Sequence, residues 1–189
     1  MKKIDGVIEF IKEIEGLKSV TRTAWTKTGR RESTAEHSWR LAMLLMLLED
    51  EFEDIDINKA IKMSLVHDLG ELYDGDISAV LQTDANTKLD IEEKAMKRML
   101  TTLPENISKN IYDLWCEYNS CSTKEAKLVK AMDKLETIVQ HNQGNNPQDF
   151  DYEFNLQYGK NYFEYDDTLK YMRNIIDEDT KININSKDI

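Results

Sequence analysis

Apolar residues recur with helical spacing along most of this chain. In the first such segment, each of six apolar residues has another three or four positions away: Ile4, Val7, Ile8, Ile11, Ile14 and Leu17. This period places them on one face of an α-helix. Helical character continues at 58–72, 88–101, 104–118, 123–142 and around 150–178. Because only two prolines and seven glycines occur in 189 residues, we predict an all-α bundle of about six to eight helices with short loops rather than a many-turned β architecture.

Two capping boxes mark the starts of predicted helices. Ser33-Thr-Ala-Glu36 has the S-x-x-E form, in which the first and last side chains each bond the other residue's backbone, and predicts a helix through about Glu49. Ser122-Thr-Lys-Glu125 has the same form and opens the segment 123–142. Both helices therefore have a defined first turn in the sequence.

Other segments are predicted to lie outside regular helices. Asp74-Gly75-Asp76 predicts a turn after the segment 58–72. The polar and basic segment 18–32 is predicted to be a loop, and the tail 180–189 is expected to fray. At 22.1 kDa the chain is most simply one domain over residues 1–189.

Charge and apolar run length restrict the class of protein. The net charge of −11 argues against nucleic acid as a partner, because a phosphate backbone needs clustered lysine and arginine. The longest apolar run, 41–48, is far too short to cross a bilayer, and the amphipathic N-terminus does not resemble a signal peptide. Cys116 and Cys121 match no common zinc motif, so we expect reduced cysteines. We therefore predict a cytoplasmic protein without a membrane partner.

The dipeptide His67-Asp68, followed by Glu71, is the first candidate for chemistry. If the segment 58–72 is one helix, adjacent His and Asp side chains leave it about 100° apart, and Glu71 projects toward the same region from the next turn. A nitrogen ligand, a carboxylate ligand and a spare carboxylate suit metal-assisted hydrolysis. The dipeptide alone occurs often by chance, so it is informative only if the rest of the chain supplies more ligands.

Two further residues complete a candidate metal site. The chain has three histidines, and His37 projects from the first turns of the helix that the capping box opens. Asp133 lies among apolar residues of the segment 123–142, where an unpaired carboxylate would be costly. Two His and two Asp would form a mixed nitrogen and oxygen site for one Mn²⁺, Co²⁺, Fe²⁺, Zn²⁺ or Mg²⁺ ion, and ligand softness does not choose among these. His141 follows Asp133 by about 12 Å of helix and is not expected to join the same ion.

The order H…HD…D, with the sequences around it, resembles the HD-domain metal-dependent phosphohydrolase superfamily. The similarity extends over about residues 15–165 and is strongest to its 5′-deoxynucleotidase branch, which includes the HD-domain-containing protein 2 family. It is carried by five motifs: Arg22-Thr-Ala-Trp25, Arg31-Glu-Ser-Thr-Ala-Glu-His37, Leu65-Val-His-Asp68, Gly75-Asp-Ile77, and Glu125-Ala-Lys-Leu-Val-Lys130 followed by Asp133.

This resemblance implies a role for individual residues. The four metal ligands of the family match His37, His67, Asp68 and Asp133. Its catalytic carboxylate matches Glu71, and the acidic residue of its GD motif matches Asp76. The family is all-α and commonly dimeric, and its activity is removal of phosphate from deoxyribonucleoside 5′-monophosphates. The resemblance thus implies a small-molecule nucleotide substrate and a homodimer.

Substrate contacts are expected from the basic segment. Arg22 falls where the family has an arginine that contacts the phosphate and sugar, and an arginine can bind phosphate as a bidentate donor. Arg31 belongs to the same positive segment, which would attract a dianionic substrate into an acidic protein. Trp25 can stack on a base. Glu71 or Asp76 can orient or deprotonate water, or protonate the leaving 5′ oxygen.

Alternatives remain at this point. Asp133 can instead pair with Lys130, Lys134 or Arg40, and each other candidate taken singly is an ordinary surface, core or capping residue. Other HD hydrolases act on nucleoside triphosphates, cyclic nucleotides or guanosine tetraphosphate. A non-catalytic HD module that binds a nucleotide around a structural metal ion is the alternative from a different class, and the spare carboxylates Glu71 and Asp76 argue against it.

Overall fold

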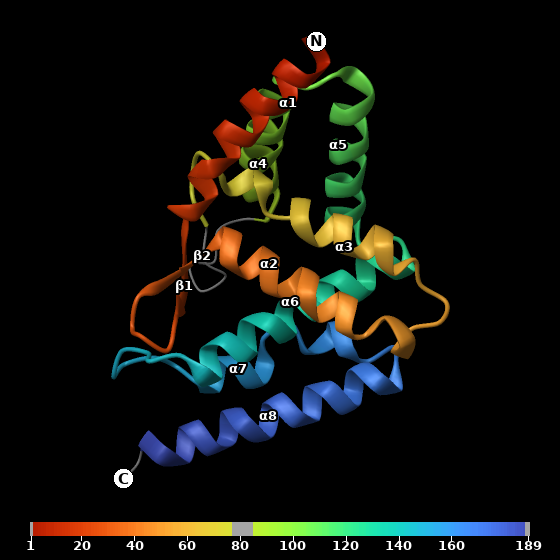
Figure 1. Ribbon diagram of the computed structural model, residues 1–189. Helices are drawn as coiled ribbons and strands as arrows, with labels where there is room; N and C mark the ends of the chain where they lie inside the picture. The colour runs from red at the N-terminus through yellow and green to blue at the C-terminus, as the bar shows by residue number, and fades with distance from the viewer. Residues whose placement is uncertain (1, 77–84, 188–189) are drawn as a thin grey trace.

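Helices form most of the molecule, as the sequence predicts. The computed structural model describes residues 2–76 and 85–187. Within these ranges the α-helices are α1 (Lys2–Glu13), α2 (Thr34–Leu47), α3 (Ile57–Val66), α4 (Ala85–Met99), α5 (Glu105–Ser120), α6 (Lys124–Gln143), α7 (Glu153–Gln157) and α8 (Asp167–Lys187) (Figure 1). Short 3₁₀ helices lie at Ile14–Lys18, Glu49–Glu51, Leu69–Glu71, Leu100–Thr102 and Lys160–Phe163. The all-α prediction is confirmed, with one small hairpin of β1 (Thr21–Trp25) and β2 (Arg31–Ser33) added.

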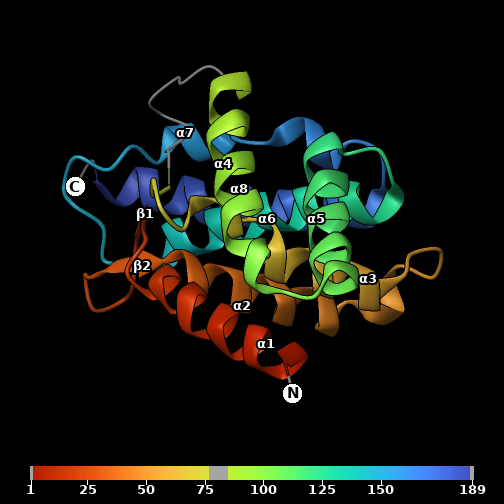
Figure 2. The same cartoon turned by 90° about the horizontal axis from the view of Figure 1, so that it is seen from above.

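Helix α6 lies at the centre of the bundle. It contacts α2, α3, α5 and α8, while α1 and α4 lie with α5 at the end of the molecule that carries the N-terminus (Figure 1). The view from above shows α4 and α5 side by side, and α8 on the far side of α6 from α1 (Figure 2). The β-hairpin lies beside the start of α2 and contacts α6. This arrangement brings the hairpin, the end of α3 and the middle of α6 together.

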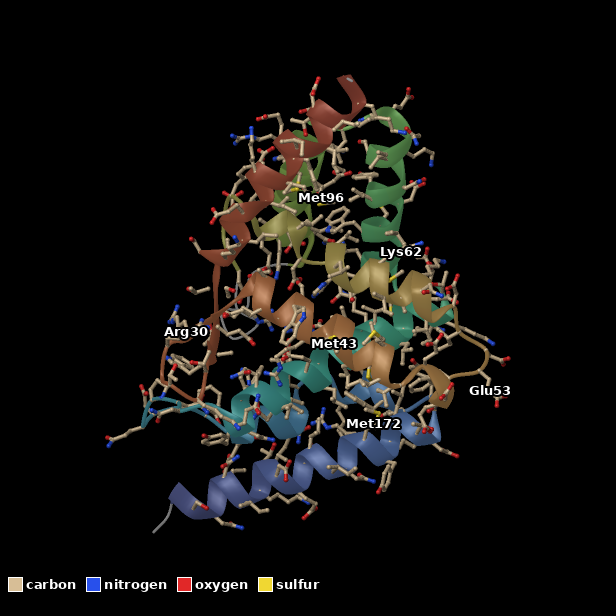
Figure 3. The ribbon with its side chains drawn as sticks, in the orientation of Figure 1. Arg30, Met43, Glu53, Lys62, Met96 and Met172 are labelled. Atoms are coloured by element: carbon tan, nitrogen blue, oxygen red, sulfur yellow. The ribbon has the colours of Figure 1, made fainter. Side chains whose placement is uncertain are left out.

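Two clusters of apolar side chains hold the bundle together. The larger is built mainly on α2, α3, α6 and α8 and includes Leu41, Leu45, Met63, Leu128, Met132 and Leu169. The second is built mainly on α1, α4, α5 and the 3₁₀ helices beside them and includes Phe10, Leu17, Leu69, Met96, Met99 and Trp115. Figure 3 labels Met96, which belongs to the second cluster, and Met172, which is partly buried and packs against the first. Helix α3 passes from one cluster to the other, because Met63 packs in the first and Val66 in the second.

The hairpin replaces the loop that was predicted for residues 18–32. Side chains of β1 alternate between exposed and buried, so that Arg22 and Ala24 point inward. Its strands pair antiparallel with Thr21 opposite Ser33, and the connection contains Gly29 at φ +83°, a backbone conformation that favours glycine. The prediction was wrong because a charged residue, Arg22, occupies one of the two buried positions of β1 and hides the two-residue period.

One capping box is confirmed and the other is displaced. Ser33 and Glu36 bond each other's backbone at the start of α2, as predicted. At α6 the cap is Thr123, whose hydroxyl accepts from the backbone N–H of Ala126 at 3.2 Å. Ser122 instead bonds the hydroxyl of Ser120, so its side chain is engaged outside the helix. The helix consequently begins at Lys124.

The predicted continuous helix over 58–72 is wrong at its end. Helix α3 ends at Val66, and a 3₁₀ turn at Leu69–Glu71 follows. Gly70 lies so close to α4 that a Cβ there would be 2.7 Å from the Cβ of Glu92. Because α4 packs directly on this turn, the chain bends where the sequence pattern alone predicts further helix. His67 and Asp68 therefore lie at a break in the helix.

The C-terminal tail also differs from the prediction. Helix α8 continues through Lys187 instead of fraying from residue 180. Thr180 is buried, and its hydroxyl and the amide of Asn183 both bond Asn142 on α6. These polar contacts extend the helix beyond its apolar pattern. Both cysteines are free. Among the described residues, no helix is long and apolar enough to cross a membrane.

Candidate functional site

The four predicted metal ligands come together from three separate elements. His37 lies in the first turn of α2, His67 and Asp68 follow α3 directly, and Asp133 lies in the middle of α6. Ligand atoms of His37, His67 and Asp133 all lie within 4.8 Å of one another. Asp68 Oδ2 is 3.0 Å from His67 Nε2 and 3.9 Å from His37 Nε2. This set of two imidazoles and two carboxylates has the donor types of a mixed metal site.

His67 has the orientation expected of a metal ligand. Its Nδ1 donates to the backbone carbonyl of Ser64 at 2.8 Å, which leaves Nε2 unprotonated in the neutral ring. Nε2 is buried and has no hydrogen-bond partner in residues 2–76 or 85–187, although Asp68 Oδ2 lies 3.0 Å away. The Nε2 and Oδ2 atoms each carry a lone pair and make no hydrogen bond to each other. Their short separation is therefore consistent with both atoms coordinating one cation. The buried nitrogen therefore supports a metal ion in this position.

The His37 ring is also oriented by a hydrogen bond from Nδ1, but here the acceptor is a side chain. Its Nδ1 donates to Glu136, and its Nε2 lies 3.1 Å from Asp133 Oδ1. Burial and Arg22 lower the pKa of the His37 imidazole, but Glu136 and Asp133 outweigh them and raise it to about 10. The surrounding carboxylates thus favour positive charge at this point, whether carried by a proton or by a metal ion.

The two aspartates are kept ionised. Burial raises the pKa of Asp133, but Lys134 and His37 outweigh it and hold that pKa well below its usual range. Asp133 Oδ2 accepts from the Tyr118 hydroxyl at 2.7 Å and from Lys134 at 3.0 Å, while Oδ1 faces His37. Burial also raises the pKa of Asp68, but the imidazole rings beside it and Arg22 together outweigh burial, and that pKa is lowered. Of the pairings considered for Asp133, only that with Lys134 forms, and it leaves Oδ1 facing the cluster.

A buried carboxylate cluster behind His37 was not predicted. Glu136 bonds His37 and lies 3.1 Å from Arg40, and Glu32 lies 3.6 Å from Arg22 Nε. A carboxylate that accepts a hydrogen bond from the outer N–H of a ligating histidine fixes the ring and raises its basicity. One signal was present in the sequence, because Glu136 follows Asp133 by one helical turn on the buried face of α6.

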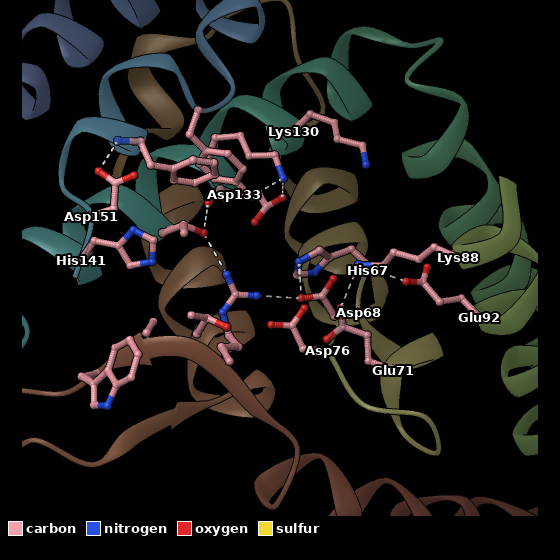
Figure 4. Close-up of a pocket in the computed structure, with 18 of the residues that line it drawn as sticks. His67, Asp68, Glu71, Asp76, Lys88, Glu92, Lys130, Asp133, His141 and Asp151 are labelled. Atoms are coloured by element: carbon pink, nitrogen blue, oxygen red, sulfur yellow. Dashed lines mark hydrogen bonds and ion pairs between the residues drawn. The ribbon is translucent and has the colours of Figure 1, made fainter. Parts of the chain in front are cut away.

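A cavity of about 580 Å³ opens onto this cluster (Figure 4). His67, Asp68 and Asp133 line one part of it, and Glu71 and Asp76 lie beside Asp68 in the same view. The lining also includes aromatic side chains and a third histidine, namely Trp25, Phe150, Phe154, Tyr158 and His141. The cavity therefore has a charged part and an aromatic part.

Glu71 and Asp76 both face the charged part of the cavity. Glu71 is only 3% exposed, accepts from the Thr34 hydroxyl at 3.2 Å and lies 3.5 Å from Lys88. Burial, with the charges of Asp68 and Asp76, raises the pKa of Glu71 to about 9. The predicted turn is present: Gly75 has φ +84° and its N–H bonds the Glu71 carbonyl at 2.9 Å. Ile77 of the GD motif lies outside the described residues.

The three predicted substrate contacts are not equally placed. Arg22 is buried in the cavity wall, where it donates to Thr137 at 2.9 Å and to Asp68 at 3.5 Å. Trp25 lines the cavity, 5.9 Å from the ring of Phe150. Arg31 is exposed, does not line the cavity, and lies over the Trp25 ring at 5.5 Å. The structure therefore brings Arg22 and Trp25 to the cavity but not Arg31.

His141 is separate from the candidate metal cluster, as expected. Its Nδ1 bonds Asn155 Oδ1 at 2.8 Å, and Figure 4 shows it across the cavity from His67. The groups of potential ligands found among the described residues do not include it. Its pKa is lowered, chiefly by burial, which suits a neutral imidazole in the cavity wall.

Comparison with known proteins identifies the family of this chain. Residues 14–173 match the HD domain family. The chain is 39% identical to the 5′-deoxynucleotidase HDDC2 of Dictyostelium discoideum over 72% of this chain and 76% of that protein. It is 36% identical to the 5′-deoxynucleotidase HDDC2 of Mus musculus over 71% of this chain and 68% of that protein.

Solved structures agree with this match. A predicted metal-dependent phosphohydrolase from Magnetospirillum magnetotacticum MS-1 superposes with a TM-score of 0.78 at 26% identity, covering 96% of this chain and 97% of that one. A conserved hypothetical protein from Pyrococcus furiosus superposes with a TM-score of 0.62 at 31% identity, covering 92% and 99%. The resemblance carried by the motifs is thus confirmed, and the chain belongs to the HD-domain family.

Proposed function

We propose that this protein is a metal-dependent phosphomonoesterase that converts deoxyribonucleoside 5′-monophosphates to nucleoside and phosphate. One observation carries the chemistry: His37, His67, Asp68 and Asp133 converge beside a cavity that also holds Glu71 and Asp76. The substrate class is supported by the relatives named 5′-deoxynucleotidase. A cavity of about 580 Å³ has the size of small-molecule sites.

The four ligands fit one divalent cation. Both imidazoles have their outer nitrogen engaged, by Glu136 and by the Ser64 carbonyl, so Nε2 of each is left for coordination. When bound, the cation would act as a Lewis acid that lowers the pKa of water and neutralises phosphoryl charge. Mn²⁺, Co²⁺, Fe²⁺, Zn²⁺ and Mg²⁺ all accept this mixed donor set, and the experiment below compares Mn²⁺, Co²⁺ and Mg²⁺.

The protein's own side chains would perform the remaining steps. Arg22, whose pKa stays above its usual value because the charges of Asp68 and Asp133 outweigh burial, would hold the phosphate as a permanent cation. In the metal-free protein the raised pKa of Glu71 favours the protonated carboxyl, the form that can donate to the leaving 5′ oxygen. The same carboxyl becomes a base for water where nearby positive charge lowers that pKa. Asp76 is the second candidate for either role.

The nucleoside would occupy the aromatic part of the cavity. Trp25 and Phe150 present ring surfaces there, and an aromatic side chain can stack on any base. Arg31 supports this surface from behind through its position over the Trp25 ring, which we propose as its role in place of direct substrate contact. Rejection of a 2′-hydroxyl would depend on hydrogen bonding and shape around the sugar.

The test is phosphate release from matched deoxy- and ribonucleoside 5′-monophosphates. It is run with Mn²⁺, Co²⁺ or Mg²⁺, with EDTA, and with Asp68→Ala. The matched control is Asp74→Ala, which removes an exposed carboxylate close by in the sequence. We expect release from the deoxy substrates, loss with EDTA and with Asp68→Ala, and normal turnover in the control.

Other results would redirect the assignment. Equal release from ribo- and deoxynucleotides would retain the phosphomonoesterase and reject the deoxy preference. No release from any monophosphate by metal-loaded protein would reject the proposed function. Nucleoside triphosphates, cyclic nucleotides and guanosine tetraphosphate would then be tested, and a binding module would follow if none is hydrolysed.

We also infer a cytoplasmic homodimer, with residues 1–189 as one HD domain. The exposed apolar side chains Ile4, Ile8 and Ile11 on α1 support a contact between copies, because exposed isoleucines at this spacing adjoin on one helix face and an exposed apolar patch favours association. Light scattering would measure the mass of the wild type and of Ile8→Glu. A monomeric wild type would reject the dimer, and an unchanged dimer in the variant would reject this surface.

A further inference from the structure

Most cations that line the cavity are already paired with carboxylates. Arg22 lies 3.5 Å from Asp68, and Lys134 lies 3.0 Å from Asp133. Lys88 lies between two carboxylates, 3.5 Å from Glu71 and 3.4 Å from Glu92. These pairs neutralise charge within the wall. They therefore offset part of the positive charge that the wall presents to an incoming anion.

Lys130 differs from these three cations. It lines the same cavity and is partly buried, yet within the described ranges no carboxylate lies within ion-pair distance of its ammonium group. Its Nζ is 3.5 Å from the centroid of the Tyr118 ring. Figure 4 shows its side chain extending from α6 without any of the marked contacts to the residues drawn. It is therefore a cation of the cavity whose hydrogen-bonding capacity is unused.

Tyr118 connects Lys130 to the candidate metal ligands. The tyrosine hydroxyl donates to Asp133 Oδ2 at 2.7 Å, and its ring lies 5.0 Å from the ring of His67. The ammonium of Lys130 is thus one aromatic ring away from two of the four ligands. A group bound at the metal cluster would have Arg22 in the wall on the hairpin side and Lys130 in the wall formed by α5 and α6.

Charge balance in the cavity calls for such a cation. Asp68, Asp76 and Asp133 all face the charged part, so their carboxylates would repel a phosphate dianion there. Burial and Lys134 lower the pKa of Lys130 to about 8, with partial compensation from Asp133 and Asp68. An ammonium group in this setting gains from a bound anion, because the anion replaces the hydration that burial removes.

We propose that Lys130 binds the phosphate of the substrate and of the inorganic phosphate product, as a second cationic contact alongside Arg22. The inference rests on the proposed function for the identity of the substrate, but phosphate binding itself can be measured separately. A lysine ammonium acts on phosphate as a point charge with three donors, whereas a nucleobase offers no charge for it to pair with. Lys130 thus contributes to recognition of the phosphate and not of the base.

The test compares Lys130→Met with Lys127→Met. Methionine keeps an unbranched stem against Tyr118 and removes the charge, and Lys127 is an exposed lysine one turn earlier on α6. The dissociation constant of inorganic phosphate for the metal-loaded protein is measured by calorimetry, alongside metal content. Inhibition by the nucleoside product is measured in the turnover assay. Lys130→Arg restores the charge.

We expect Lys130→Met to weaken phosphate binding by about tenfold or more, as for loss of a hydrogen bond to a charged group. Inhibition by nucleoside and metal content should change less than about twofold, and Lys130→Arg and Lys127→Met should bind phosphate nearly as the wild type does. Unchanged phosphate binding in Lys130→Met would overturn the proposal. So would a parallel loss of metal, which would assign the effect to the metal cluster. If Lys130→Met does not fold, the same comparison is made with Lys130→Gln.

The proposed function and this inference fail in different ways. Normal turnover with phosphate binding unaffected by Lys130→Met would retain the function and reject the inference. No turnover of any monophosphate, together with Lys130-dependent binding of inorganic phosphate, would reject the function and retain the inference.

Discussion

The start of α2 and the segment after α3 present the same side chain to the same carboxylates but hold it differently. His37 donates from Nδ1 to the side chain of Glu136, which lies 99 residues later in the chain. His67 donates from Nδ1 to the backbone carbonyl of Ser64, three residues earlier. Both rings are almost completely buried, and both turn Nε2 toward the aspartates.

The two histidine rings are therefore oriented in two different ways. The orientation of His37 depends on long-range packing of α2 against α6 and on one carboxylate that also faces Arg40. The orientation of His67 depends on local backbone at the end of α3 and is independent of the Ser64 side chain. A substitution can therefore weaken one support without touching the other, while loss of either ring should have the same consequence.

The largest expected effect tests whether the two histidines are equivalent. His37→Ala and His67→Ala should each lose bound metal and lower turnover by at least about 10⁴-fold, because the contribution of a metal ion amounts to several kcal/mol. Metal content by atomic absorption and phosphate release are measured on the same samples. His141→Gln, which alters the third buried histidine, should retain metal. Full metal content in either alanine variant would show that the replaced histidine is not a metal ligand.

The second prediction concerns proton transfer, which is assigned to Glu71 in the segment after α3. Glu71→Gln should lower turnover by about 10³-fold while metal content stays at the wild-type level, because Glu71 is assigned to proton transfer and not to coordination. Asp74→Asn, in the exposed part of the same turn, is the control. Wild-type turnover in Glu71→Gln would remove this residue from the mechanism, and loss of metal would make it a ligand.

A third prediction separates the supports of the two rings. Glu136→Gln should weaken metal binding by about 10- to 100-fold, the usual cost of losing a carboxylate behind a ligating histidine. Ser64→Ala should leave metal binding unchanged, because His67 bonds the carbonyl and not the hydroxyl. Titration with a competing chelator gives both dissociation constants. Equal values for Glu136→Gln and wild type would show that metal binding does not depend on the negative charge behind His37.

The same two regions differ in how far the sequence predicts them. The prediction for the start of α2 was correct, because a capping box is a local signal and Ser33 and Glu36 make the expected hydrogen bonds. The prediction for the end of α3 was not, since the bend is imposed by α4 packing against Gly70, a contact between segments. The spacing of His67, Asp68 and Glu71 nevertheless brought all three to the cavity, although the helical geometry used to predict this was wrong.

Residues that act through tertiary contacts escaped prediction. Glu136 and Lys130 lie on α6 at positions that are charged in an otherwise apolar pattern, but nothing in the pattern names their partners. Glu136 gains its role from α2 and Lys130 from Tyr118 on α5. Arg22 was predicted at the site through a family motif, yet its strand was assigned to a loop, since a buried arginine conceals the alternation of β1. Local signals thus identify the candidate ligands better than they identify the residues that orient them.

The smallest expected effect sharpens the comparison through one buried carboxyl group in each region. Burial raises the pKa of Glu71, after α3, to about 9, and that of Glu32, before α2, to about 7. Each folded-state pKa exceeds the ordinary value of 4.5, so the folded protein binds more protons than the unfolded chain between 4.5 and the raised value. Stability of the metal-free protein should therefore fall as pH rises through that window.

Replacing Glu71 or Glu32 with a neutral glutamine should reduce the decrease in stability with pH, each over a different pH range. Urea unfolding in EDTA gives the free energy of unfolding at intervals from about pH 5 to about pH 9. Glu71→Gln should remove at least about 1.4 kcal/mol of the decline, one pKa unit, and the effect should persist above about pH 7. Glu32→Gln should alter the decline only below about pH 7, because the folded-state carboxyl is already ionised above it. A decline in Glu71→Gln parallel to that of the wild type would mean that this carboxyl is ionised in the folded protein, which would leave it suited to the base role alone.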